Sequence, residues 1–289
     1  MSEKPYLIAE AGCNHKGEMS IARDLINTAA CYCKADAIKF QKRCNRELLT
    51  EEQYNAPHPN PANSYGATYG EHREFLEFNV EQHAQLKAWC EEAGITYSTS
   101  VWDMTSAKEI ASLEPEFIKI PSACNNHYEM LSWLCENYGG EIQISLGMTT
   151  HEEEQALIDL FKKHGRNQDL VMFACTSGYP VPYEDICLLE LKRLQEMYGD
   201  QVKKIGFSGH HIGTAPDLAA LALGAQVIER HFTLDKTWKG TDHAASLEPD
   251  EMHDLRKNLD DVAAALTYKS VEYLDIEAVQ RAKLKYRAH

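Results

Sequence analysis

The chain has 289 residues, of which 44% are hydrophobic and 25% charged, so its composition is typical of a globular protein and excludes a disordered or fibrous one. Its 29 Lys and Arg against 44 Asp and Glu give a formal net charge of -15, which predicts repulsion from nucleic acid and from anionic membranes. We therefore expect neither as a partner.

The amino-terminal residues lack the layout of a secretory signal, and no apolar stretch approaches the roughly 20 residues of a membrane helix. Nine cysteines in such a chain indicate reduced thiols rather than a disulfide framework. The sequence therefore predicts a cytoplasmic protein.

Short β-rich apolar runs alternate with helical patterns along the chain, which is typical of repeated βα units and a parallel sheet. The predicted strands span residues 6–11, 37–41, 96–99, 117–121, 143–146, 170–174, 205–208 and 227–231. Residues 42–79 are rich in Pro and Gly and predict a loop insertion over one end of the sheet. We expect one domain over residues 1–270 and a tail over 271–289.

Eight βα units fit either a closed barrel or a doubly wound open sheet. The first strand leads into AEAGCNHKG, which does not match the GxGxxG of a dinucleotide-binding open sheet. Nearly every predicted strand instead ends in a polar residue able to do chemistry, and a barrel active site is built from such strand ends. The sequence therefore predicts an α/β protein with a single-domain (β/α)₈ TIM barrel.

Two lysines, Lys39 and Lys119, stand at strand ends among β-branched residues, where an unused ammonium group is costly to bury. Hydroxyl groups stand near the ends of other strands, in Thr99, Ser122, Ser145 and Ser208. Together they predict a cradle for a phosphate and a carboxylate.

Two histidines, His210 and His231, end the neighbouring strands seven and eight, so their imidazoles can converge on one divalent metal ion. Glu10 is a carboxylate within an apolar first strand, which makes it a candidate base or hydroxyl acceptor. Tyr179 and Asp242 lie on the loops after strands six and eight, where a substrate would be gripped or where they serve as turn residues.

Seven segments, in order, resemble the N-acetylneuraminate (sialic acid) synthase family between Tyr6 and Glu251. They are IAEAGCNHKG, DAIKFQ, KIPSACNN, SLGM, YPVPYED, GFSGHH and LGAQVIERHFTLDKTWKGTDHAASLEPDE. The resemblance implies a transferase that forms a carbon–carbon bond. Phosphoenolpyruvate adds through C3 to the open-chain aldehyde of an N-acylhexosamine or related hexose, water enters at C2, and phosphate leaves. The product is a nonulosonic, sialic-type acid.

The resemblance also implies roles for single residues. Phosphoenolpyruvate would be held by Lys39, Thr99, Lys119, Ser122, Ser145 and Ser208. His210 and His231 would hold manganese, with magnesium or cobalt as alternatives. Glu10, Gln41, Tyr179 and Asp242 would meet the sugar or the attacking water.

The sequence departs from the family pattern at several places. Cys124 stands where the family has an acidic residue, Ser177 replaces an Asn, and Gly209 replaces an Asp. We keep Cys124 as a catalytic candidate and Ser177 as a substrate-binding one. Family members continue into an antifreeze-like domain that reaches across a dimer. We expect this chain to lack that domain, which favours another product, such as a legionaminic-type sugar, and leaves a homo-oligomer open.

Other functions stay open at this point. One is a 3-deoxy-octulosonate-phosphate-type synthase of the same fold, and a second is an aldolase that forms a Schiff base on Lys39 or Lys119. A third is a sugar-binding relative without catalysis.

Overall fold

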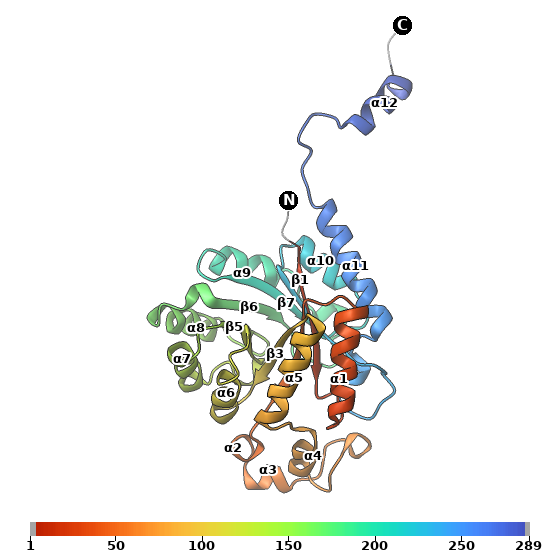
Figure 1. Ribbon diagram of the computed structural model, residues 1–289. Helices are drawn as coiled ribbons and strands as arrows, with labels where there is room; N and C mark the ends of the chain where they lie inside the picture. Colours follow the sequence, from red (N-terminus) through yellow and green to blue (C-terminus); the bar gives the residue numbers. More distant parts are fainter. Residues whose placement is uncertain (1–3, 287–289) are drawn as a thin grey trace.

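The computed structural model describes residues 4–286, and eight parallel strands close into a barrel in chain order (Figure 1). The strands are β1 (Tyr6–Gly12), β2 (Ala37–Lys42), β3 (Thr96–Val101), β4 (Phe117–Ile120), β5 (Glu141–Ser145), β6 (Leu170–Cys175), β7 (Lys204–Gly209) and β8 (Val227–His231). Strands β1 and β8 pair with each other, which closes the sheet. The predicted barrel is confirmed, with strand ends shifted by at most two residues.

Helices connect the strands, and most of them surround the barrel (Figure 1). They are α1 (Met19–Asn27), α2 (Asn45–Leu48), α3 (Glu51–Asn55), α4 (Tyr69–Leu76), α5 (Val80–Ala93), α6 (Met104–Ala111), α7 (Tyr128–Asn137), α8 (His151–Lys163), α9 (Glu190–Tyr198), α10 (Ala215–Ala222), α11 (Pro249–Ala265) and α12 (Asp275–Leu284). Helix α12 has no buried residue, and Figure 1 shows it standing away from the barrel. The division of the chain at residue 270 stays a prediction.

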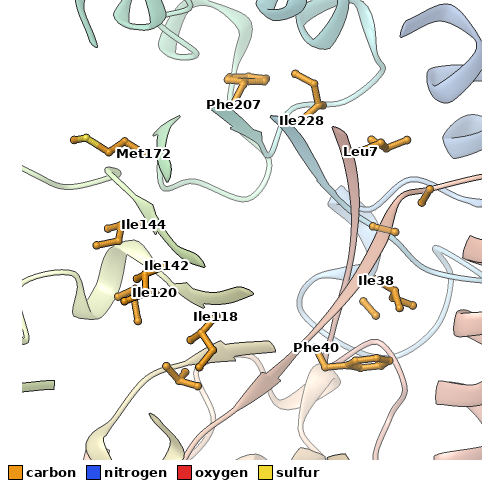
Figure 2. Packing of buried hydrophobic residues seen from close by; sticks show 14 of the residues in the cluster. Leu7, Ile38, Phe40, Ile118, Ile120, Ile142, Ile144, Met172, Phe207 and Ile228 are labelled. Carbon is orange, nitrogen blue, oxygen red and sulfur yellow. The ribbon is translucent and has the colours of Figure 1, made fainter. Parts of the chain in front are cut away.

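The strands have two different faces. Their outward side chains, such as Leu7, Ile38 and Ile142, pack with helix residues in one large apolar layer (Figure 2). A second, smaller cluster comes from alternate strand positions and fills the inside of the barrel; it consists of Ile8, Ala37, Phe117, Val171, Phe173 and Val227, with Tyr6 against it. Because side chains alternate along a strand, the polar residue two positions after several of these faces the same interior, closer to the carboxyl ends.

The predicted loop insertion after β2 contains short helices. The side chains of Thr50 and Thr68 each accept a hydrogen bond from the backbone N–H three residues on. The side chains of Gln53 and Glu71 in turn accept from the backbone N–H of Thr50 and Thr68, which completes two capping boxes. These caps satisfy the free N–H groups that begin α3 and α4. The insertion is therefore a structured cover beside the ends of β2 and β3.

His83 of α5 is sealed between that helix and β3. Its Nδ1 lies 2.8 Å from the hydroxyl oxygen of Tyr97, and the side chain is 0% exposed. Burial, followed by the charge of Lys42 and by His15, lowers the pKa of His83 from 6.5 to about 3. The imidazole is therefore neutral in the folded protein at physiological pH.

This burial predicts a contribution to acid lability. Between pH 6.5 and about 3 the unfolded chain binds a proton at His83 that the folded chain does not, so the free energy of unfolding falls as pH falls. One such group contributes about 1.4 kcal/mol per pH unit. In urea unfolding from pH 7 to 4, His83→Gln should lower this slope by about that amount. His151→Gln, at an exposed position of α8, is the control; an unchanged slope in His83→Gln would contradict the prediction.

Candidate active site

A cavity of about 410 Å³ opens at the carboxyl ends of the strands. Its walls come from all eight strands or the loops that follow them: Glu10, Lys39, Gln41, Arg43, Ser100, Trp102, Lys119, Pro121, Ser122, Ala123, Ser145, Met148, Cys175, Ser177, Tyr179, Ser208, His210, Glu229, His231, Thr241 and Asp242. The apolar cluster inside the barrel lies on the same strand faces and forms its floor. Convergent polar groups above an apolar floor are typical of a barrel active site.

Most residues predicted for a site are brought together here. They are Glu10, Lys39, Gln41, Lys119, Ser122, Ser145, Ser177, Tyr179, Ser208, His210, His231 and Asp242. They come from every part of the sequence, and the strand order of the barrel places them around one cavity.

Thr99 and Cys124 lie outside the cavity, contrary to the prediction. Thr99 pairs in register with the outward Phe40, and its hydroxyl lies 3.5 Å from His83, so it belongs to the layer between barrel and helices. The thiol of Cys124 faces the carbonyl oxygens of Val101 at 3.6 Å and Pro121 at 3.7 Å. Burial and the charge of Asp103 raise its pKa, so it stays a neutral packing group.

Nine other residues line the cavity that were not predicted as site residues, among them Ser100, Glu229, Arg43 and Trp102. Ser100, one residue after Thr99, faces inward, and Glu229 stands two residues before His231 on the same strand face. Strict alternation from His231 would have found Glu229, whereas the inward face of Ser100 follows only from the register of β3 against β2, in which it pairs with Gln41. Arg43 and Trp102 follow the ends of β2 and β3, and no periodicity marks their orientation.

A buried charge network lies at the base of the cavity. The ammonium group of Lys119 donates to both carboxylate oxygens of Glu229, at 2.9 and 2.8 Å, and Ser208 donates to one of them at 2.9 Å. Lys39 Nζ lies 3.8 Å from the same carboxylate, contacts Glu10, and donates to Ser100 Oγ at 2.7 Å. Glu229 is therefore a counterion shared by two lysines on β2 and β4, and Glu10 is the nearer carboxylate to Lys39.

The two carboxylates of this network have different acidities. Burial favours the neutral acid in Glu229, but the charges of Lys119 and Lys39 outweigh it and hold its pKa well below the usual range. In Glu10, burial raises the pKa, and Lys39 offsets only part of that effect. A pair of carboxyl groups with separated pKa values is the arrangement in which one stays ionised while the other exchanges a proton.

Serine hydroxyls and a glycine form a concave wall at the ends of β4, β5 and β6. Ser122 Oγ accepts a hydrogen bond from the backbone N–H of Gly147 at 2.9 Å. A Cβ atom on Gly147 would lie 2.3 Å from Ser177 Oγ and 2.8 Å from Ser122 Oγ, so no side chain fits there. Hydroxyls and backbone at such close approach suit the oxygens of a phosphate or carboxylate.

His210 and His231 stand side by side, with ring centroids 5.4 Å apart. The backbone oxygen of Thr176 lies 3.1 Å from Nδ1 of His210, which places the proton on that nitrogen and leaves Nε2 with a free lone pair. Burial and then His231 lower the pKa of His210 to about 3, so the ring is neutral. Nδ1 of His231 is buried and has no hydrogen-bond partner within residues 4–286, and the Tyr179 ring packs against both imidazoles.

Glu10, Gln41 and Asp242 converge around Gly12 at the end of β1. A Cβ at Gly12, whose φ is +52°, would meet Gln41 Nε2 at 3.0 Å, Glu10 Oε1 at 3.2 Å and Asp242 Oδ2 at 3.8 Å. Acceptors and an amide at this spacing can bind the hydroxyl groups of a polyol.

The sequence of residues 25–271 matches the model of the NeuB family. The chain belongs to the NeuB family. It is 37% identical over 284 residues to human N-acetylneuraminate-9-phosphate synthase, covering 96% of this chain and 76% of that protein. It is 32% identical over 265 residues to N,N'-diacetyllegionaminic acid synthase of Campylobacter jejuni, covering 91% and 78%. The predicted family is confirmed.

Solved structures agree with this NeuB assignment. The N-acetylneuraminic acid (sialic acid) synthetase of Leptospira borgpetersenii matches with a TM-score of 0.82 and 26% identity, over 99% of this chain and 94% of that one. The phospho-2-dehydro-3-deoxyheptonate aldolase of Thermotoga maritima, at 13% identity and a TM-score of 0.68, shares the fold alone. The chain is thus an enzyme of the class that forms carbon–carbon bonds in sialic-type acids. Between residues 4 and 286, no helix is long and apolar enough to span a bilayer.

The charge network predicts a large effect of Glu229→Ala on stability. This change leaves the ammonium groups of Lys119 and Lys39 buried with less counter-charge, and breaking a buried pair on one side costs about 3–5 kcal/mol. Urea unfolding measures the loss. In Glu91→Ala, which removes a surface pair with Lys87 at 3.7 Å, the expected loss is under about 1 kcal/mol. An equally small loss in Glu229→Ala would show that Glu229 is not the counterion of the lysines.

Proposed function

We propose that this enzyme condenses phosphoenolpyruvate with the open-chain aldehyde of an N-acylhexosamine or related hexose and releases phosphate. The supporting observation is the combination, in one cavity, of two buried lysines, a hydroxyl-lined wall and two neutral imidazoles. The lysines and the hydroxyl-lined wall suit a small molecule with a carboxylate and a phosphate. The two imidazoles suit a metal ion that activates an aldehyde.

Phosphoenolpyruvate would lie against Lys39, Lys119 and the wall of Ser122, Ser145 and Ser177. Lys119 lies between Glu229 and the face of Phe173, at 3.8 Å from the ring centroid, so its position is fixed before a substrate arrives. Because the lysines are already ordered, binding an anion costs little side-chain entropy. A preorganised positive charge in a buried site also strengthens attraction to the substrate.

A divalent cation, manganese or alternatively magnesium or cobalt, would bind to His210 and His231. The donors fit, because neutral imidazole nitrogens suit such ions and His231 carries an unpaired buried nitrogen. Residues 4–286 contain no group of three or more His, Cys, Asp or Glu side chains able to hold a metal, so water or substrate oxygens would complete the coordination. When bound, the ion would polarise the aldehyde as a Lewis acid.

The protein side chains would handle the protons and the sugar. Glu10, whose pKa burial raises, is the group best suited to exchange a proton with the attacking water or the new hydroxyl. Gln41 and Asp242 beside it would bind sugar hydroxyls. Tyr179, against both imidazoles, would shield the reacting carbonyl from bulk water.

The acceptor sugar differs among the relatives. One is named for a 9-phosphate product and another for a diacetyllegionaminic product. The family therefore supports a nonulosonic acid as product, and the sugar itself, with its acyl groups, is to be measured.

The test is release of phosphate from phosphoenolpyruvate with a panel of acceptors, with and without manganese. The panel contains N-acetylmannosamine, other N-acylhexosamines, their 6-phosphates, free hexoses and arabinose 5-phosphate. We expect release with an N-acylhexosamine or its phosphate, and a product whose mass is that of sugar plus pyruvate. Release with arabinose 5-phosphate alone would establish the octulosonate-type activity instead. Borohydride inactivation in the presence of substrate would establish a Schiff-base aldolase.

His231→Ala should abolish turnover that depends on added metal, because it removes one of the two imidazoles. A second readout is manganese binding, followed by electron paramagnetic resonance, which should weaken by at least about tenfold. His253→Ala, a histidine whose Nδ1 bonds the backbone oxygen of Tyr32 at 2.8 Å, outside the cavity, is the control. Full turnover by His231→Ala after chelation would refute the metal site.

A further inference from the structure

Arg73 of α4 is a nearly buried cation that lies in the field of Glu77 but forms no direct ion pair within residues 4–286. The side chain lies over the rings of Tyr69, at 5.3 Å from the centroid, and Trp102, at 5.7 Å, and the residue is only 9% exposed. Within residues 4–286 its guanidinium group has no hydrogen-bond acceptor and no carboxylate within 4.0 Å. Buried charges in proteins are normally paired, so the arrangement calls for an anion.

Arg43 adds a second guanidinium group beside it. Its Cζ also lies 5.7 Å from the Trp102 ring, and its own carboxylate, Glu77, accepts at 2.5 Å from Nε. One carboxylate thus faces two cations. The indole nitrogen of Trp102 is also buried, and no described residue offers it a hydrogen-bond acceptor. The two guanidinium groups and the indole N–H therefore have fewer acceptors than they can bind.

At His72 the neighbouring groups make the potential positive, although the chain carries a net charge of -15. His72, next to Arg73 on α4, is buried between several cationic groups. Burial first, then His58, Arg43, Arg73 and Lys239, lower its pKa to about 4. Every one of these neighbours disfavours a further positive charge, which is the field that attracts an anion.

Arg43 and Trp102 lie at the sugar side of the cavity, and Arg73 contacts the Trp102 ring without lining the cavity itself. Arg43 follows Gln41 at the end of β2, and Arg43 and Trp102 both line the cavity together with Asp242. Arg43 Nη2 lies 3.0 Å from Sγ of Cys13, the residue after Gly12, around which the sugar-binding polar groups converge. The lysines suited to phosphoenolpyruvate stand deeper, on strands β2 and β4.

We propose that Arg43 and Arg73 form an anion site for a phosphate ester on the acceptor sugar, at the carbon furthest from the aldehyde. The inference rests on the proposed function, which places the aldehyde at the imidazoles. An N-acylhexose has no other charged group, so its phosphate is the anion that fits. Arg43 contacts the phosphate from the cavity wall, and Arg73 completes its neutralisation from α4.

The experiment compares N-acetylmannosamine with its 6-phosphate. In the wild-type enzyme, kcat/KM for the phosphate should exceed that for the free sugar. Arg73→Gln should reduce this preference about tenfold to a hundredfold, the range for losing a hydrogen bond to a charged group. Arg73→Lys, which keeps the charge but not the planar fork, should retain part of it. Arg46→Gln is the control, an exposed arginine of the same insertion that stacks on Tyr54.

Calorimetric binding of the two sugars without phosphoenolpyruvate separates this site from the reaction. Tighter binding of the 6-phosphate, lost in Arg73→Gln and kept in Arg46→Gln, supports the anion site even if no turnover occurs, in which case the proposed condensation alone fails. Equal kcat/KM and equal binding of both sugars would refute the anion site while leaving the condensation intact. A rise in KM for phosphoenolpyruvate in Arg73→Gln, with the sugar preference unchanged, would assign the arginine to the other substrate and also refute it.

Discussion

Glu229 neutralises two lysines at the centre of the barrel, and the rest of the cavity is arranged around that contact. Lys39 and Lys119 reach the carboxylate from separate strands, and Ser208 donates to it from a third. Without the shared counterion, the ammonium group of Lys119 would lie buried and unpaired, and that of Lys39 would keep only Glu10, which is strongly unfavourable. With it, positive charge is held ready for an anionic substrate at little cost in reorganisation.

The closed sheet makes this arrangement possible. Each strand sends one set of side chains outward into the helix layer and the alternate set inward. Inside, apolar residues occupy the lower positions and polar residues the positions near the carboxyl ends. The same alternation assigns Glu10 and Glu229 to one network, where the different numbers of neighbouring lysines separate their acidities.

The loop and insertion after β2 carry two arginines near the cavity that no strand provides. Arg43 and Arg73 both lie over the ring of Trp102, which lines the cavity, in a protein with a net charge of -15. Their field is local because salt and solvent screen distant surface charges, whereas partly buried groups are screened much less. The overall charge therefore disfavours polyanionic partners without opposing a small phosphorylated substrate.

The sequence alone determined the barrel, its eight strands, the family and most residues of the cavity, because each strand is a local apolar pattern that ends in a polar group. It did not determine which face a polar residue takes. Thr99 and Ser100 are adjacent, and only pairing with β2 turns the serine inward. Likewise, Cys124 is placed against backbone oxygens and Arg73 beside Arg43 by contacts between distant segments. Charge pairing and side-chain direction depend on such contacts, so only the tertiary structure decided them.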